Sequence, residues 1–210
     1  MKRSLAVLAV LLVPALVDAM PVTDPAGWSL TIPDRYREAP KTPGALYSFA
    51  HGASADADFS AIQIQDAGGT IANEPVDHAV VERSARDSVK GTGVEILSFD
   101  YRKVRWKTFD LDVVISRMRK GDTSIVSLVT QVPLVGKAIQ IAIAGPARDT
   151  DRLIADLTQI VSSIEGESSW LSSAERSERI GKGVGMVVGV LGALGLLSWW
   201  RRRARRAAAS

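Results

Sequence analysis

The chain has 210 residues, no cysteine and a formal net charge of +3. The lack of cysteine excludes disulfides and thiolate metal sites. Residues 1–19 carry +1 and residues 182–206 carry +6, which leaves −4 for residues 20–181. The positive charge therefore belongs to the two ends, and this argues against a nucleic-acid-binding domain, which would carry it on its folded surface.

Residues 1–19 have the anatomy of a secretory signal peptide. Lys2 and Arg3 precede a short apolar run, Pro14 breaks that run, and small residues precede the expected cleavage after Ala19. The apolar run is too short to span a membrane comfortably. We therefore expect the mature chain to begin near Met20, and the alternative is an uncleaved N-terminal anchor. Without cysteine, a lipid anchor at this site is excluded.

The first half of the exported part predicts three strands and one helix. Alternation of apolar and polar residues indicates strands at 28–33, 45–50 and 60–65. A helix is expected from Val76 to Lys90, because Asn73-Glu-Pro75 is a start signal and glycines follow the run. Its apolar face is thin, so it should lie on a sheet with its other side exposed.

The second half predicts a run of strands closed by a second helix. Segments 94–100, 104–109, 111–118, 124–132 and 138–144 are rich in Val, Ile, Thr and aromatic residues. The first two could form one bent strand. A helix capped by Asp149 or Thr150 follows, with apolar residues at helical spacing up to Ile164. The expected core contains Trp28, Ile62, Ile64, Val126, Leu128, Ile139, Ile141, Leu153, Leu157 and Ile160.

The C-terminal end predicts a membrane anchor. Residues 166–179 are Ser-rich and charged, as expected of a juxtamembrane linker, and residues 180–200 are apolar enough for a single transmembrane helix. Trp199 and Trp200 suit the membrane interface, and five arginines in the tail 201–210 favour the cytoplasmic side. The predicted localisation is the cytoplasmic membrane, crossed once, with the domain 22–165 on the periplasmic or extracellular side.

The order of elements predicts an α+β fold, a curved antiparallel sheet with covering helices, followed by the transmembrane helix. The opening Gly27–Pro33, the segment Val132–Pro146 and the closing amphipathic helix resemble the PsbP-like superfamily. The resemblance covers residues 22–165. It implies a curved antiparallel sheet between helical layers and a non-catalytic accessory or binding role. No functional residue of that family can be matched to a position here.

Motifs for catalysis or cofactors are absent from the sequence, and we expect no catalytic residues, no cofactor and no resident metal. His78 with Glu82 is an i, i+4 pair that could supply two metal ligands, but a solvated helix face is the favoured interpretation. Asp56 and Asp58 lie in a loop without the glycine and glutamate of a calcium-binding loop, so a merely polar loop is favoured.

Two patterns suggest contact surfaces. Lys103, Arg105 and Lys107 alternate along one strand, and Arg117 and Arg119 could extend them into a patch for an anionic partner. The competing interpretation is a solvated face paired with Asp100, Asp110 and Asp112. In the membrane segment, small residues recur every four positions, a spacing that permits close helix pairing and a homodimer. These residues are Gly181, Gly185, Gly189 and Ala193.

The leading functional hypothesis is a membrane-tethered, non-catalytic binding or accessory module on the outer face of a bacterial cytoplasmic membrane, with an unidentified protein partner and no nucleic acid. Two alternatives remain. One is an exported enzyme, hydrolase-like, without a recognisable motif. The other is a structural membrane protein that self-associates through its Gly-rich helix.

Overall fold

The computed structural model describes residues 19–53 and 58–171. The chain divides into two units, residues 1–167 and 168–210, and the second is described only over residues 168–171. The predicted signal peptide, transmembrane helix, basic tail and Gly181, Gly185, Gly189 and Ala193 lie outside the described residues, as does Asp56. Among the helices of the described residues, none has the length and apolar character needed to cross a membrane.

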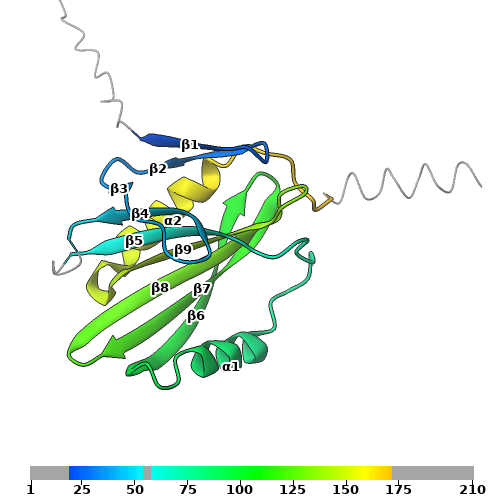
Figure 1. Cartoon of the computed structure of the whole chain (residues 1–210). Coiled ribbons are helices and arrows are strands. Elements are labelled where there is room, and N and C mark those ends of the chain that lie inside the picture. Colours follow the sequence, from blue (N-terminus) through cyan, green and yellow to red (C-terminus); the bar gives the residue numbers. More distant parts are fainter. Residues whose placement is uncertain (1–18, 54–57, 172–210) are drawn as a thin grey trace, which may run out of the picture. The chain divides into compact units, whose positions relative to one another are not determined.

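The first unit is built on an antiparallel sheet of seven strands, in the order β3-β4-β5-β9-β8-β7-β6 (Figure 1). Its strands are β3 (Arg37–Glu38), β4 (Ala45–His51), β5 (Ser60–Asp66), β6 (Val94–Trp106), β7 (Phe109–Lys120), β8 (Thr123–Val132) and β9 (Ile139–Pro146). A separate hairpin pairs β1 (Met20–Asp24) with β2 (Trp28–Ile32). With two helices added, the architecture is α+β, as predicted.

Alternation on the central strands β5, β8 and β9 divides the large sheet into two unlike faces. On β5 and β9, for example, Ile62, Ile64, Ile141 and Ile143 are fully buried, whereas the residues between them are half-buried. Because successive side chains of a strand point to opposite faces, one face of the sheet forms the core and the other does not. All ten core residues expected from the sequence are buried.

Helix α2 (Thr150–Ser162), preceded by a short 3-10 turn η1 (Ala147–Asp149), packs on the buried face beside β2. Leu153, Leu157, Ile160 and Val161 form its buried stripe. Gly145 on β9 allows this packing, because a Cβ at that position would lie 3.1 Å from Leu153 Cδ1 and 3.0 Å from Ser60 Cβ. Because glycine has no side chain, Leu153 of the helix can approach the backbone of β9 closely.

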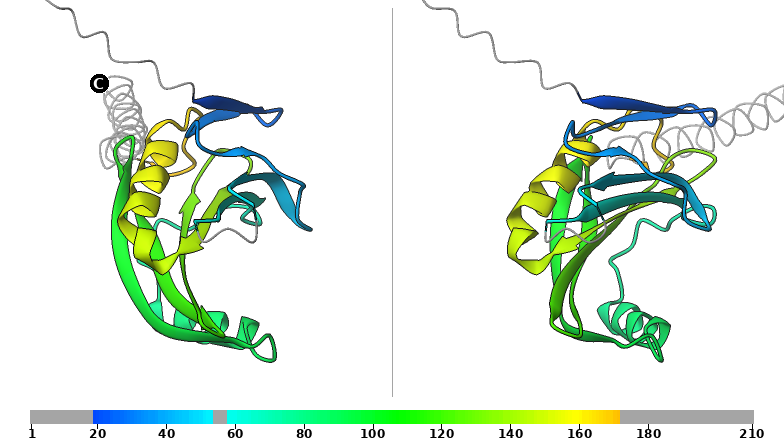
Figure 2. Two further views of the ribbon diagram at one scale, coloured as in Figure 1. Left: turned by 90° about the vertical axis from the view of Figure 1, so that its left-hand side faces the viewer. Right: turned by 60° about the vertical axis from the view of Figure 1, so that its left-hand side comes forward.

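Helix α1 (His78–Ser88) lies on the other side of the long strands β6–β8 (Figure 2). It begins later than expected, because the Asp77 carboxylate accepts the N–H groups of Ala79 and Val80 and so caps the helix. None of its residues is buried. Its contact with the sheet is made at the edge strand β6, where the His78 ring stacks on Tyr101 at 3.5 Å and Arg86 lies over Phe99.

Of the two interpretations of segments 94–100 and 104–109, the structure shows one strand: they belong mostly to β6, with a register shift between Ile96 and Ser98 that leaves Leu97 unpaired as a bulge. Strands β1 and β3 were not predicted. Strand β3 has only two residues, and β1 contains Pro21 and exists by pairing with β2.

Candidate functional site

The strand register separates the five cations that the sequence suggested as a patch. Lys103 and Arg105 share one face of β6 with their β7 partners, and they form ion pairs with Asp112 (2.9 Å) and Asp110 (2.8 Å). Lys103, Arg105 and Asp110 are exposed and Asp112 is half-buried, so each pair contributes little to stability. Arg117 and Arg119 occupy odd positions of β7 and therefore face the opposite side of the sheet from Asp110 and Asp112.

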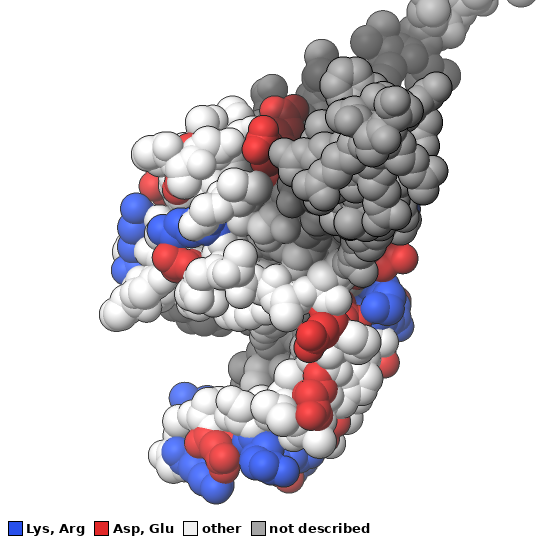
Figure 3. Space-filling model, turned by 90° about the vertical axis from the view of Figure 1, so that its right-hand side faces the viewer, with Lys and Arg blue, Asp and Glu red and all other residues white. Residues whose placement is uncertain are grey.

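Arg117, Arg119 and Lys107 each contact a different neighbouring residue. Arg117 donates to the Thr150 hydroxyl at the start of α2 (3.3 Å), and Arg119 pairs with Glu95 at 2.6 Å. Lys107 lies in the β6–β7 turn with φ 51° and donates to the Gly166 carbonyl. On the face drawn in Figure 3, positive and negative side chains lie side by side. The structure does not bring the five cations together.

The pair His78 and Glu82 converges on Tyr101. The Tyr101 hydroxyl lies 3.3 Å from Glu82 Oε1, to which it donates, while His78 covers the tyrosine ring. Burial, followed by the Glu82 carboxylate, raises the pKa of Tyr101. Within residues 19–53 and 58–171, no three His, Asp or Glu side chains are grouped as a metal site. The ring stacking of His78 and the hydrogen bond to Glu82 are contacts that hold α1 on β6.

A buried polar cluster, which the sequence did not predict, joins the N-terminal segment to α2. We define it as Arg35, Tyr36, Ser60 and Asp156. The Tyr36 hydroxyl donates to Asp156 Oδ2 (2.8 Å) and accepts from Arg35 (3.0 Å) and Ser60 (3.4 Å). Arg35 also forms an ion pair with Asp156. The His51 ring meets Tyr36 edge-on. Tyr36 and Ser60 are fully buried, so the cluster acts as an internal tie.

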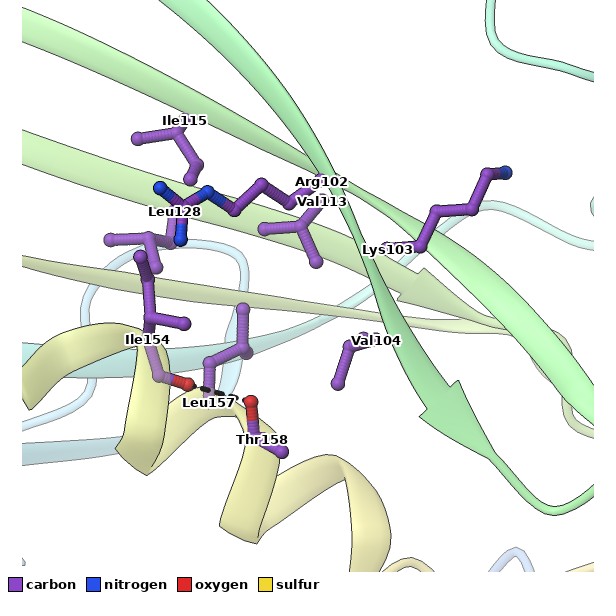
Figure 4. Close-up of a pocket in the computed structure, with 9 residues that line it drawn as sticks. All are labelled: Arg102, Lys103, Val104, Val113, Ile115, Leu128, Ile154, Leu157 and Thr158. Carbon is purple, nitrogen blue, oxygen red and sulfur yellow. Dashed lines mark hydrogen bonds between the residues drawn. The ribbon is translucent and has the colours of Figure 1, made fainter. Parts of the chain in front are cut away.

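A small apolar cavity lies between α2 and strands β6–β8 (Figure 4). Its volume is about 30 Å³, enough for one or two water molecules. Val104, Val113, Leu128 and Leu157 contribute to its walls, and the side chain of Arg102 runs along its mouth, whereas Lys103 points away. At this size the cavity is a packing gap rather than a ligand site.

The most extensive candidate surface is the uncovered side of the sheet, which we call the open face. Its side chains are half-buried and uncharged, and they come from four neighbouring central strands. They are Ala61, Gln63, Gln65, Val114, Ser116, Ser127, Val129, Gln140, Ala142 and Ala144. The register places Gln63, Ala142, Val129 and Val114 in one row across β5, β9, β8 and β7, and Ala61, Ala144, Ser127 and Ser116 in the next.

Polar groups border the open face along one edge. Gln65 donates to Gln63 (3.2 Å), Gln140 donates to Gln65 (3.5 Å) and Gln131 donates to Gln140 (3.3 Å). Helix α1 stands at the β6 border through its contacts with Phe99 and Tyr101. Figure 3 shows a hollow directly above the lower part of the domain, which carries α1. The open face is therefore a shallow floor of Ala, Ser, Val and Gln side chains, bordered at β6 by helix α1.

Asp66, at the end of β5, offers a test by pH. A hydrogen bond from the Gly68 N–H, and then the Lys137 ammonium at 3.2 Å, lower the pKa of Asp66 below its usual range. The ionised form therefore stabilises the fold above the unfolded pKa of about 3.9, and this contribution is lost as pH falls through the folded value. We expect Asp66→Asn to be less stable at neutral pH and to lose less stability on acidification. Urea midpoints at neutral and strongly acidic pH measure this, and equal losses in both proteins would contradict it.

Comparison with known proteins gives likeness of structure only. No protein-family profile matches the chain, and no curated protein matches it by sequence. The solution structure of cyanobacterial PsbP from Synechocystis sp. PCC 6803 aligns with 73% of this chain and 95% of its own, at 14% identity and a TM-score of 0.49.

Two further structures align over similar shares of the chain. LpqN, involved in cell envelope biogenesis of Mycobacterium tuberculosis, aligns with 70% of this chain and 84% of its own, at 16% identity and a TM-score of 0.41. A structure from Bacteroides thetaiotaomicron VPI-5482 aligns with 71% of this chain, at 10% identity and a TM-score of 0.42, and the aligned part is 48% of that protein. The chain thus spans about half the length of the Bacteroides protein. The resemblance to PsbP expected from the sequence is confirmed, at low identity and over about 70% of the chain.

Proposed function

We propose that this protein is a non-catalytic binding module, exported and tethered to the outer face of the cytoplasmic membrane, and that it binds a protein partner through its open face. The observation that carries the proposal is the contrast between the two faces of the sheet. The face under α2 carries the buried apolar core, whereas the open face leaves a continuous set of uncharged side chains half-exposed.

The lack of charge and the shape of the open face suit a protein more than a small molecule. The centre of a protein interface is depleted of charge and bordered by a polar rim. Here Val114, Val129 and the alanines occupy the middle, and the glutamine row lies along one edge. A small-molecule ligand is usually enclosed in a deep pocket, whereas this surface is a shallow floor.

The proposed location is supported by the two ends of the sequence. A cleavable signal would export the domain, and an apolar segment 180–200 followed by arginines would retain it in the membrane with its C-terminus inside. A domain tethered in this way meets its membrane-bound partners at a raised effective concentration, so even a modest surface affinity suffices for function.

Photocrosslinking in intact cells tests the binding surface. Benzoylphenylalanine replaces either Ala142, in the middle of the open face, or Ala155, which is exposed on α2. Both replacements start from alanine, and Ala155 is the more exposed of the two, so a weaker product from it cannot be due to lower accessibility. We expect a discrete crosslinked product on irradiation of the Ala142 protein and none from the Ala155 protein. Equal products from both, or a product only from Ala155, would reject the open face as the binding surface.

Reporter fusions test the location separately. A reporter that is active only outside the cytoplasm should be active when fused after residue 165 and inactive when fused after Ser210. The reverse pattern would overturn the orientation without bearing on the crosslinking result.

A further inference from the structure

Both rows of the open face continue onto the edge strand β6. Tyr101 pairs with Val114, so its ring stands at the end of the row that begins at Gln63. Phe99 pairs with Ser116 and ends the next row in the same way. Because directly opposite residues of paired strands share a face, both aromatic rings lie on the same side of the sheet as the open face.

Helix α1 covers these two rings. The His78 ring stacks on Tyr101, with 3.5 Å between the ring centroids, and the Arg86 guanidinium lies 5.5 Å from the centre of the Phe99 ring. The Tyr101 hydroxyl donates to Glu82 at 3.3 Å. Figure 2 shows α1 on the side of the long strands away from α2. The helix therefore occupies the aromatic end of the surface that we propose for binding.

The attachment of α1 to the sheet is weak in comparison with that of α2. None of the residues of α1 is buried, whereas α2 buries an apolar stripe that includes Leu153, Leu157 and Ile160. Burial of apolar surface is the main favourable term in folding. Elements with few buried apolar contacts open at a low cost in free energy. Helix α1 can therefore leave the sheet while the core under α2 stays intact.

The connections on both sides of α1 contain glycines in the left-handed region. Gly69, between β5 and the helix, has φ 103°, and Gly91, between the helix and β6, has φ 76°. A Cβ at either position would meet nothing within 4 Å, so neither glycine is needed for close packing. Their backbones adopt a wider range of conformations than those of other residues. The two connections can therefore change direction and let α1 move as a unit.

The open face without β6 lacks the side chains on which protein interfaces depend most. The centres of interfaces are enriched in aromatic residues, and tyrosine is common among the residues that dominate binding. The floor of the open face consists of Ala, Ser, Val and Gln side chains. Tyr101 and Phe99 would add two aromatic rings in register with both rows, but in the present structure these rings contact α1.

We propose that α1 is a displaceable cover of the open face, and that the partner binds the released Tyr101 and Phe99 as aromatic anchors. The inference rests on the binding surface of the proposed function and adds its regulation. The partner binds the state in which α1 has moved away, so the fraction of uncovered protein sets the apparent affinity. A change that weakens the attachment of α1 raises this fraction and strengthens binding by the same factor while the covered state predominates.

A photocrosslinking probe at position 101 tests whether the partner reaches the ring under α1. Benzoylphenylalanine replaces Tyr101 in the full chain in intact cells, and the product is compared with that from Ala142. We expect a product of the same mass from both positions. Phe109 is the matched control, because it is also a half-buried aromatic residue but lies on the α2 side of the sheet, opposite Trp106. The Phe109 protein should give no such product.

A second measurement keeps Tyr101 and loosens the helix. His78→Ala removes the ring that stacks on Tyr101, whereas Val80→Ala shortens a side chain of the same helix that is 56% exposed. Each is combined with the probe at Ala142, at an expression level where the product is not saturated. We expect His78→Ala to raise the yield of product about two- to tenfold, as the loss of one aromatic contact predicts. Val80→Ala should leave the yield unchanged.

The outcomes separate this inference from the proposed function. A product from the Ala142 protein but none from the Tyr101 protein would overturn the displaceable cover and leave the open face as the binding surface. No product from either protein would overturn the proposed function and the inference together. A yield that His78→Ala leaves unchanged, or changes only as much as Val80→Ala does, would show that α1 does not restrain binding, even where position 101 crosslinks.

Discussion

Replacing Asp156 by alanine is expected to destabilise the first unit by about 3 kcal/mol, because removing one partner of a buried ion pair leaves the other charge uncompensated. Asp156 is 7% exposed and accepts the only proton that the fully buried Tyr36 hydroxyl can donate. Arg35 would lose the carboxylate with which it forms its ion pair. Its side chain is 20% exposed, so water can partly replace that partner. Its Nε is already buried without a hydrogen-bond partner. Partial exposure of Arg35 is why we place the loss at the lower end of the range for buried pairs.

Asp156→Asn should cost less than Asp156→Ala, because the amide oxygen can still accept from Tyr36 and only the charge is lost. An exposed pair gives the matched control. Asp87 on α1 and Lys90, just after that helix ends, lie 2.6 Å apart but are 56% and 77% exposed, so Asp87→Ala should cost less than about 1 kcal/mol. Urea denaturation of the full chain in detergent, followed by tryptophan fluorescence, measures all three. Equal losses for Asp156→Ala and Asp87→Ala would show that the polar cluster does not hold α2 in place.

Sequence periodicity predicted the sheet core because burial on the central strands β5, β8 and β9 alternates from residue to residue. Ile62 and Ile64 on β5, and Ile139 and Ile141 on β9, are two positions apart, and all four are fully buried. The same reasoning predicted the stripe of α2. It did not reveal the polar cluster, although Asp156 gives a local signal. Asp156 lies on the apolar stripe of α2 that Leu153, Leu157 and Ile160 form, and a carboxylate at such a position needs a buried partner.

The arrangement of the cations could not be read from single strands, because it depends on the register between β6 and β7. Trp106 pairs with Phe109, so the turn has two residues and places even positions of β6 opposite odd positions of β7. Lys103 therefore shares a face with Asp112, not with Arg117. Such turns are usually signalled by Asn-Gly or Asp-Gly. Here the two turn residues are Lys107 and Thr108, and Lys107 adopts the left-handed conformation that Asn or Gly usually takes. The sequence therefore carried no signal for this turn.

The open face depends on a tertiary fact of the same kind. Alternation in β5, β8 and β9 predicts that one side of each strand is less buried, but not whether a helix covers that side. The thin apolar stripe of α1 indicated a helix that lies on the sheet. Its aromatic and cationic contacts with Tyr101 and Phe99 place it at the β6 border, away from the central strands. Only the position of that helix defines the surface proposed for binding.

Leu157→Ala is expected to cost about 3–5 kcal/mol, the upper part of the range for such substitutions. Leu157 is 1% exposed at the centre of the stripe of α2, and it lines the existing cavity of about 30 Å³. The space left by its side chain would join that cavity. The walls on the opposite side are strand residues such as Val113 and Leu128, whose backbones are held in the sheet, so they cannot close the gap.

Two further variants separate cavity formation from a simple loss of helix packing. Ile154 lines the same cavity but is only half-buried, so Ile154→Ala should cost clearly less than Leu157→Ala. Val113→Ile adds one methylene toward the gap and should stabilise the fold by up to about 0.8 kcal/mol if the added group fits. Urea denaturation measures each change. A Leu157→Ala protein of nearly native stability would show that α2 does not depend on this contact, because a docked helix cannot lose its central buried leucine without loss of stability.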